Sequence, residues 1–169
     1  MLFHRTILST LLATILSQAA LAQTAAPQYR LRGDAPTGSS IPRTLSGEVP
    51  ISINKRYDEL TPEEKEWLNR DYERIAPGDE PPFPAQGLEP VYAAISEAQQ
   101  KLHATGKLSL FATVDPEGNV TQVQAAGDTD AAMTKAAATI VTLTKFKPAV
   151  CNGTPCKMEF AFRFNFTRH

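Results

Sequence analysis

The two cysteines are the residues with the most obvious chemistry. Cys151 and Cys156 bracket Asn-Gly-Thr-Pro, a four-residue stretch typical of a reversal that leads into a last strand. The two thiols then face each other, and an oxidising compartment favours a disulfide between them. A redox-active pair or half of a metal site is the alternative. Redox pairs usually have two intervening residues, and a metal site needs further ligands, for which His103 and His169 are the histidines at hand beyond the N-terminal segment.

The carboxylates that lie close together in the sequence have structural explanations. Glu63, Glu64 and Glu66 suit the first turn of a solvated helix, and Asp128 and Asp130 suit a helix cap. The chain has no Gly-x-Ser-x-Gly, His-Glu-x-x-His, phosphate-binding glycine loop or zinc spacing. The sequence therefore predicts a non-catalytic protein without cofactor or metal. Catalysis by two carboxylates distant in sequence is the alternative.

Composition bounds the class of protein but does not identify its partner. The 169 residues are 42% hydrophobic and 21% charged, with a formal net charge of −1, which is ordinary for one globular domain with tails. This balance gives no electrostatic reason to expect nucleic acid or an anionic membrane as partner.

The N-terminus has the pattern of a cleavable signal peptide. A short basic start is followed by a mostly apolar stretch from Thr6 to Ala19, and Ala20-Leu21-Ala22 provides the small-x-small cleavage pattern. An uncleaved anchor is the alternative, but the apolar stretch is shorter than the roughly 20 residues of a membrane span and contains several polar residues. We expect cleavage after Ala22 and export of the remainder.

The next two segments are a linker and a capped helix. Residues 23–56 are rich in Pro, Gly, Ser and Thr and predict a flexible linker. Thr61, Pro62 and Glu64 form a helix start with a capping box, which predicts a helix over residues 63–75. A Pro-rich extended connection follows, so that residues 57–87 form one unit ahead of a domain at 88–169.

The C-terminal part alternates helices and strands. A helix is predicted at 89–104, a hairpin from 107–114 and 120–126, and an Ala-rich helix at 130–144, capped by Asp128 or Thr129. The strictly alternating aromatic segment Met158–Phe166 predicts the strand that dominates the core. The fold class is α+β, with an antiparallel sheet packed against helices.

The order of these motifs resembles the C-terminal domain of TonB proteins over residues 88–166. The resemblance is carried by Pro90-Val91-Tyr92, by the hairpin with its Asp115-Pro116-Glu117-Gly118-Asn119 turn, by Phe146-Lys147-Pro148-Ala149 and by Asn152-Gly153-Thr154-Pro155 before the aromatic strand. It implies a three-stranded antiparallel sheet covered by helices. It also implies a periplasmic location and a role in binding a short segment of an outer-membrane transporter, which adds as a strand beside the last strand.

Strand addition of this kind would use the backbone of the last strand for affinity and its outward side chains for specificity. Those side chains are Glu159, Arg163 and Asn165, which are otherwise ordinary solvated strand residues. The short linker, the extra helix and the cysteine pair depart from TonB itself, and a chain without an N-terminal anchor could not transmit inner-membrane energy. The alternative is a structural or stress-related envelope protein that keeps the fold without binding peptides.

Overall fold

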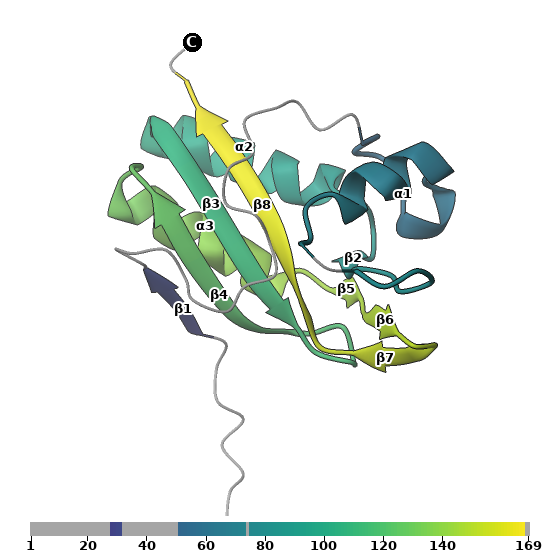
Figure 1. The fold of residues 1–169 in the computed structure, drawn as a ribbon. Coiled ribbons are helices and arrows are strands. Elements are labelled where there is room, and N and C mark those ends of the chain that lie inside the picture. Colours follow the sequence, from purple (N-terminus) through teal and green to yellow (C-terminus); the bar gives the residue numbers. More distant parts are fainter. Residues whose placement is uncertain (1–27, 32–50, 74, 168–169) are drawn as a thin grey trace, which may run out of the picture.

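The computed structural model describes residues 28–31, 51–73 and 75–167. The expected signal peptide and most of the expected linker lie outside these residues. The described part is an α+β fold in which α2 and α3 cover one face of a sheet, and α1 lies beside its last strand (Figure 1). The elements, in chain order, are β1 (Gln28–Leu31), η1 (Tyr57–Glu59), α1 (Pro62–Asn69), β2 (Phe83–Pro84), α2 (Glu89–Leu102), β3 (Gly106–Val114), β4 (Val120–Gly127), α3 (Ala131–Leu143), β5 (Phe146–Lys147), β6 (Ala149–Cys151), β7 (Thr154–Cys156) and β8 (Met158–Phe166).

The main sheet contains the expected antiparallel strands in the order β4-β3-β8. The β3–β4 hairpin reverses where the sequence predicts it, because the Asp115 carboxylate accepts hydrogen bonds from the backbone N–H of Glu117 (3.0 Å) and Asn119 (2.7 Å). The sheet has one strand more than expected: β1 pairs in parallel with β4. The predicted three-stranded antiparallel sheet is thus confirmed, and it is extended at the β4 side.

The core lies between this sheet and the helices α2 and α3. Alternation along β8 turns Phe160, Phe162 and Phe166 inward, with exposed fractions of 4%, 1% and 7%. They meet the inward side chains of β3 and β4 and the buried faces of the two helices, including Val91, Ile95, Met133, Ala137 and Val141. The aromatic strand therefore has the core role that its sequence predicts.

The opposite face of the sheet has a smaller apolar cluster. Tyr72 and Phe111 are its buried members, and Ala161 is among the partly buried residues packed against them. Phe111 is the register partner of Ala161, so the Tyr72 ring lies over the junction of β3 and β8. Residues following α1 thus cover part of the sheet face that the helices leave open.

The predicted helix at 63–75 is wrong in its extent. Its start is confirmed, since Thr61 and Glu64 form the capping box, but α1 ends at Asn69. Beyond it the chain turns, because the Tyr72 ring packs on the sheet and Asp71 pairs with a β8 side chain. The third helix also differs in detail: its N-cap is Asp130, whose carboxylate accepts from the N–H of Met133 at 2.8 Å.

Contacts with the core are already made ahead of the boundary expected after residue 56. Ile51 is 7% exposed and belongs to the main core, and the Ser52 N–H donates to the Glu64 carboxylate at 2.9 Å. These contacts attach residues 51–56 to α1, which the Pro- and Gly-rich composition of the preceding segment did not indicate.

Candidate partner-binding edge

Strand β8 lies at one edge of the main sheet. It pairs along its whole length with β3, from Gly106 opposite Phe166 to Val114 opposite Met158. Across the described ranges no strand pairs with its other side. The three predicted partner-binding residues, Glu159, Arg163 and Asn165, all lie on β8, on the sheet face opposite the core helices.

Hydrogen bonding identifies which backbone groups of β8 point outward. The Tyr72 hydroxyl donates to the backbone oxygen of Glu159 at 2.8 Å. Residues of an antiparallel edge strand point their backbone groups alternately toward and away from the neighbouring strand. The outward set is therefore Glu159, Ala161, Arg163 and Asn165.

The turn after α1 lies against this outward side. The Arg163 guanidinium pairs with the Asp71 carboxylate at 2.8 Å, and the two side chains are 19% and 20% exposed. Tyr72 is 7% exposed, and its burial raises the pKa of the phenol above its usual range, so the hydroxyl keeps its proton and remains a donor. The half of the β8 edge from Glu159 to Arg163 therefore already has contacts from its own chain.

A narrow hollow remains between α1 and β8. Its volume is about 50 Å³. One wall comes from α1 and the turn after it, another from residues around the start of α2, and the floor from β8; the lining includes Trp67, Leu68, Asp71, Leu88, Tyr92, Phe160, Ala161 and Arg163. A hollow of this size admits a few water molecules, since one water needs about 10–15 Å³ of such space.

The C-terminal end of β8 has a different environment. Asn165 is exposed, while the Phe164 ring packs edge-on against Tyr92 at 5.5 Å between centroids. The Gln99 amide of α2 donates to the backbone oxygen of Thr167 at 3.0 Å. Of the three predicted residues, Asn165 is thus the one presented to solvent.

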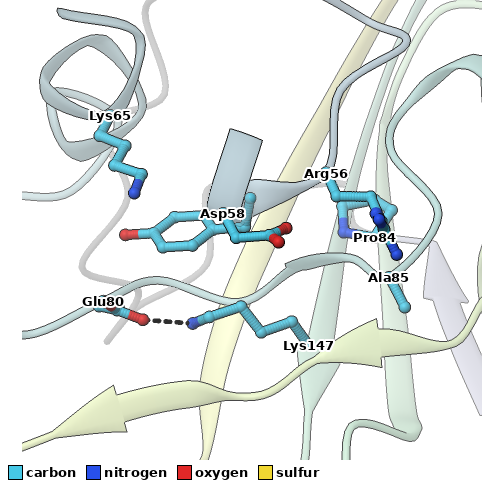
Figure 2. A pocket seen from close by; sticks show the side chains of 8 residues that line it. Arg56, Asp58, Lys65, Glu80, Pro84, Ala85 and Lys147 are labelled. Atoms are coloured by element: carbon cyan, nitrogen blue, oxygen red, sulfur yellow. Dashed lines mark ion pairs between the residues drawn. The ribbon is translucent and has the colours of Figure 1, made fainter. Parts of the chain in front are cut away.

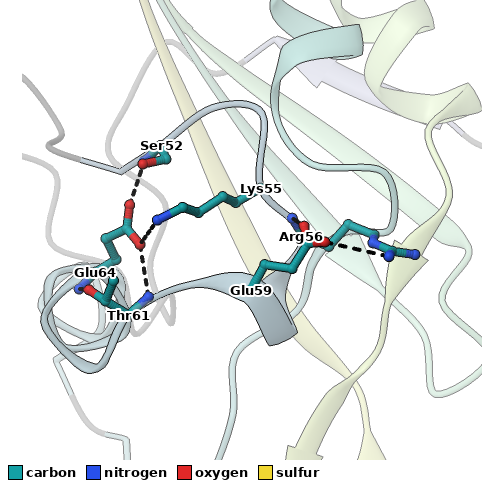
Figure 3. A network of polar contacts seen from close by, with 6 residues as sticks. All are labelled: Ser52, Lys55, Arg56, Glu59, Thr61 and Glu64. Atoms are coloured by element: carbon teal, nitrogen blue, oxygen red, sulfur yellow. Dashed lines mark hydrogen bonds and ion pairs between the residues drawn. The ribbon is translucent and has the colours of Figure 1, made fainter.

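A network around Glu64 ties the start of α1 to residues 52–55 (Figure 3). The Glu64 carboxylate accepts from the N–H of Ser52 (2.9 Å), the N–H of Thr61 (2.8 Å) and the Lys55 ammonium (3.1 Å). Hydrogen bonds from Ser52 and Thr61 hold the pKa of Glu64 at about 2. This carboxylate therefore ties the start of α1 to the chain that precedes it.

A second hollow of about 470 Å³ lies beside η1 (Figure 2). The Tyr57 ring lies between the ammonium groups of Lys65 and Lys147, at 4.8 and 4.3 Å from its centroid, and Lys147 also pairs with Glu80 at 2.8 Å. Burial, followed by the charge of Glu80, raises the pKa of Tyr57 to about 12. These contacts hold η1 against β5, which gives the hollow a structural explanation.

The cysteine prediction is confirmed. Cys151 ends β6, Cys156 ends β7, and the two form a disulfide with a Cα–Cα distance of 5.8 Å. The reversal between them has Asn152 and Gly153 at positive φ (50° and 79°), as expected for a tight turn. The hairpin directly precedes β8.

Neither a metal-binding cluster nor a membrane-spanning helix is found among the described residues. Among those the structure describes, no group of three or more His, Cys, Asp or Glu side chains could hold a metal ion. No helix within residues 51–73 and 75–167 is long and apolar enough to cross a membrane.

Sequence reasoning missed Asp71 and Tyr72. Tyr72 falls within the helix predicted at 63–75, but it lies beyond the end of α1, and its hydroxyl reaches a carbonyl 87 positions away. Asp71 carried no local signal, and its partner is 92 positions away. Only the tertiary structure brings these two residues to the edge of β8.

Comparison with known proteins agrees with this fold. The family model for the C-terminal domain of the Gram-negative bacterial TonB protein matches residues 90–167, from the start of α2 through β8. No curated protein and no solved structure gives a significant match. Proteins of this family are generally non-enzymatic, act in the cell envelope and interact with other proteins there. Residues 90–167 thus match the TonB C-terminal family over the part of the chain that forms α2, α3 and the antiparallel strands β3, β4 and β8.

Proposed function

We propose that this chain is a periplasmic protein-binding module, exported through a signal peptide at residues 1–22, and that it binds a partner segment as a strand added to the outer edge of β8. The observation that supports strand addition is the position of β8, which has a strand on one side only among the described residues. The partner would be a protein or peptide of the envelope, such as a segment of an outer-membrane transporter.

The physical basis is the row of outward backbone groups along β8. Main-chain hydrogen bonds to an added strand give affinity that depends little on sequence, whereas neighbouring side chains select the partner. Arg163 provides a cation and Asn165 a solvent-exposed amide on this row, with Glu159 near its other end. The core helices cover the inward face, so strand addition would leave the core intact.

Proline substitution at the exposed end of β8 tests this. The N–H of Asn165 is in the outward set, so Asn165→Pro removes a donor for an added strand without removing a hydrogen bond to β3. Asn165→Ala is the matched control. A photo-cross-linker at Thr167, expressed in the full chain in a Gram-negative host, should give an adduct with an envelope protein in the Ala variant and lose it in the Pro variant. An adduct that survives Asn165→Pro contradicts strand addition.

Export is tested in the same cells. Fractionation should recover the protein in the periplasm, with an N-terminus at Gln23. A product that keeps residues 1–22 in the inner membrane would contradict the cleavage and support an anchored protein.

A second candidate is a structural or stress-related envelope protein that keeps the fold without binding peptides. The contacts of Tyr72 and Asp71 with β8 favour it, because they occupy part of the edge that strand addition needs. This candidate predicts that no cross-link forms at the end of β8 in any variant.

A further inference from the structure

The turn after α1 makes the kinds of contact with β8 that an added strand would make. A strand beside β8 would donate backbone N–H groups to outward carbonyls. In this chain the Tyr72 hydroxyl donates to the carbonyl of Glu159, and the Asp71 carboxylate pairs with Arg163, four residues further along the strand. The turn thus satisfies one backbone acceptor and one side-chain cation of the edge.

With the turn in place, a second strand does not fit beside this half of β8. Paired strands run about 4.8 Å apart. The hollow between α1 and β8 has a volume of about 50 Å³, and Trp67, Leu68 and Asp71 form its far wall. A strand can therefore pair with Ala161 and its neighbours only after α1 and the turn have moved.

The segment that would have to move is small. Helix α1 has eight residues, and a helix this short is not stable without tertiary contacts. Trp67, on its surface, is 36% exposed. Leu68 and Tyr72 provide its buried apolar contacts, and Glu64 ties its start to residue 52. Release of the segment from β8 would take Leu68 out of the main core, whereas the side chains from the sheet, α2 and α3 would still pack on one another.

We propose that Pro62–Tyr72 is a built-in plug of the β8 edge, and that the strand which displaces it has an acidic side chain opposite Arg163. Charge complementarity supports this partner: Arg163 is 19% exposed and has an Asp carboxylate at 2.8 Å in the closed protein. A strand that removes Asp71 leaves the guanidinium without this carboxylate unless it brings its own. The inference rests on the proposed strand addition.

Hydrogen exchange tests the plug without any partner. The full chain would be compared with the double variant Asp71→Asn/Tyr72→Phe, which removes one charge and one hydroxyl while conserving shape. Glu66→Gln is the control. It removes an exposed carboxylate of α1 that pairs with Arg70, at 3.3 Å, and not with β8. The amide of Ala161, which faces α1, should exchange about tenfold faster in the double variant, while that of Phe162, which faces β3, stays unchanged. An unchanged rate at Ala161 overturns the plug.

Peptide binding then tests the partner chemistry. The probe is a hexapeptide of alternating Thr and Val with Asp at its third position, and the comparison peptide has Lys there. The double variant should bind the Asp peptide about tenfold more tightly than the unaltered chain or Glu66→Gln does. Each of the three proteins should bind the Lys peptide more weakly than it binds the Asp peptide.

The remaining outcomes separate the two proposals. Equal affinity of the Asp peptide for the unaltered chain and the double variant overturns the plug and leaves strand addition in place. Faster exchange at Ala161 with no binding of either peptide contradicts strand addition and the acidic partner together. Equal affinity for the Asp and Lys peptides overturns the acidic partner. If circular dichroism shows that the double variant does not fold, Tyr72→Phe alone takes its place. The exchange rate at Ala161 and the affinity for the Asp peptide should then each rise about fivefold.

Discussion

Replacement of Glu64 by Ala should selectively destabilise α1 and the segment that precedes it. The Glu64 side chain is 10% exposed and accepts hydrogen bonds from the N–H groups of Ser52 and Thr61, at 2.9 and 2.8 Å, and from Lys55. A hydrogen bond to a charged group contributes roughly 1.5–3 kcal/mol. Two such bonds, at the lower bound because the segment is near solvent, give a loss of about 3 kcal/mol.

The chain provides its own reporter for this experiment. Trp67 is the single tryptophan of the sequence and lies in α1, so its fluorescence follows the release of this helix. Urea titration by Trp67 fluorescence should show the loss of about 3 kcal/mol in Glu64→Ala. Glu66→Ala is the control: the Glu66–Arg70 pair is 70% and 57% exposed, so its removal should cost less than about 0.5 kcal/mol.

The pH dependence gives an independent check. The folded-state pKa of Glu64 is lowered from 4.5 to about 2, so the carboxylate stabilises the protein at pH values above the unfolded pKa. This contribution falls as the pH drops from 4.5 toward 2, where the folded protein takes up the proton too. The difference in stability between the unaltered chain and Glu64→Gln should shrink over that window. Losses in Glu64→Ala and Glu66→Ala that agree within 0.5 kcal/mol, or a difference that does not change over this pH range, would refute the reasoning.

Three further substitutions probe the domain itself. Replacing Cys151 and Cys156 by Ser should cost about 2 kcal/mol in urea unfolding, because the bridge closes a loop of only five positions, and reductant should lower the unaltered chain to the same midpoint. Gly118→Ala should cost more than Gly153→Ala: both glycines have φ near +78°, but a Cβ at Gly118 collides with a backbone carbonyl of β5, whereas at Gly153 it meets nothing within 4 Å. Equal losses would show that this collision relaxes. Phe162→Ala, at a side chain 1% exposed, should lower the free energy of unfolding by about 3–5 kcal/mol, and a loss below 1 kcal/mol would contradict its place in the core.

The parts of the fold that local patterns specify could be predicted from the sequence. The strict alternation of Met158–Phe166 predicts a strand with one buried face, and that strand is β8 with its bounds unchanged. The capping box at Thr61 and the Asp-Pro-Glu-Gly-Asn turn likewise appear where their side chains satisfy neighbouring backbone groups. In each case the residues that determine the structure lie within a few positions of one another.

The parts that depend on distant partners could not be predicted. Helix α1 stops at Asn69 because Asp71 and Tyr72 find partners on β8, about ninety positions later in the chain. A predicted helix that includes Tyr72 indicates neither the conformation of the turn nor the target of the Tyr72 hydroxyl. Strand β1 was missed for the same reason: its pairing with β4 has no counterpart in a local pattern.

The same long-range contacts bear on specificity. If the Asp71 and Tyr72 contacts together favour the closed edge by about 1.4 kcal/mol, the open form is roughly a tenth as abundant as the closed one, and every incoming strand binds about tenfold more weakly than to an open edge. A strand with a carboxylate recovers the ion pair with Arg163, whereas a neutral or basic strand does not. The plug would lower every affinity by the same factor, so the choice between partners would come from the Arg163 guanidinium, even though the backbone of β8 accepts any extended chain.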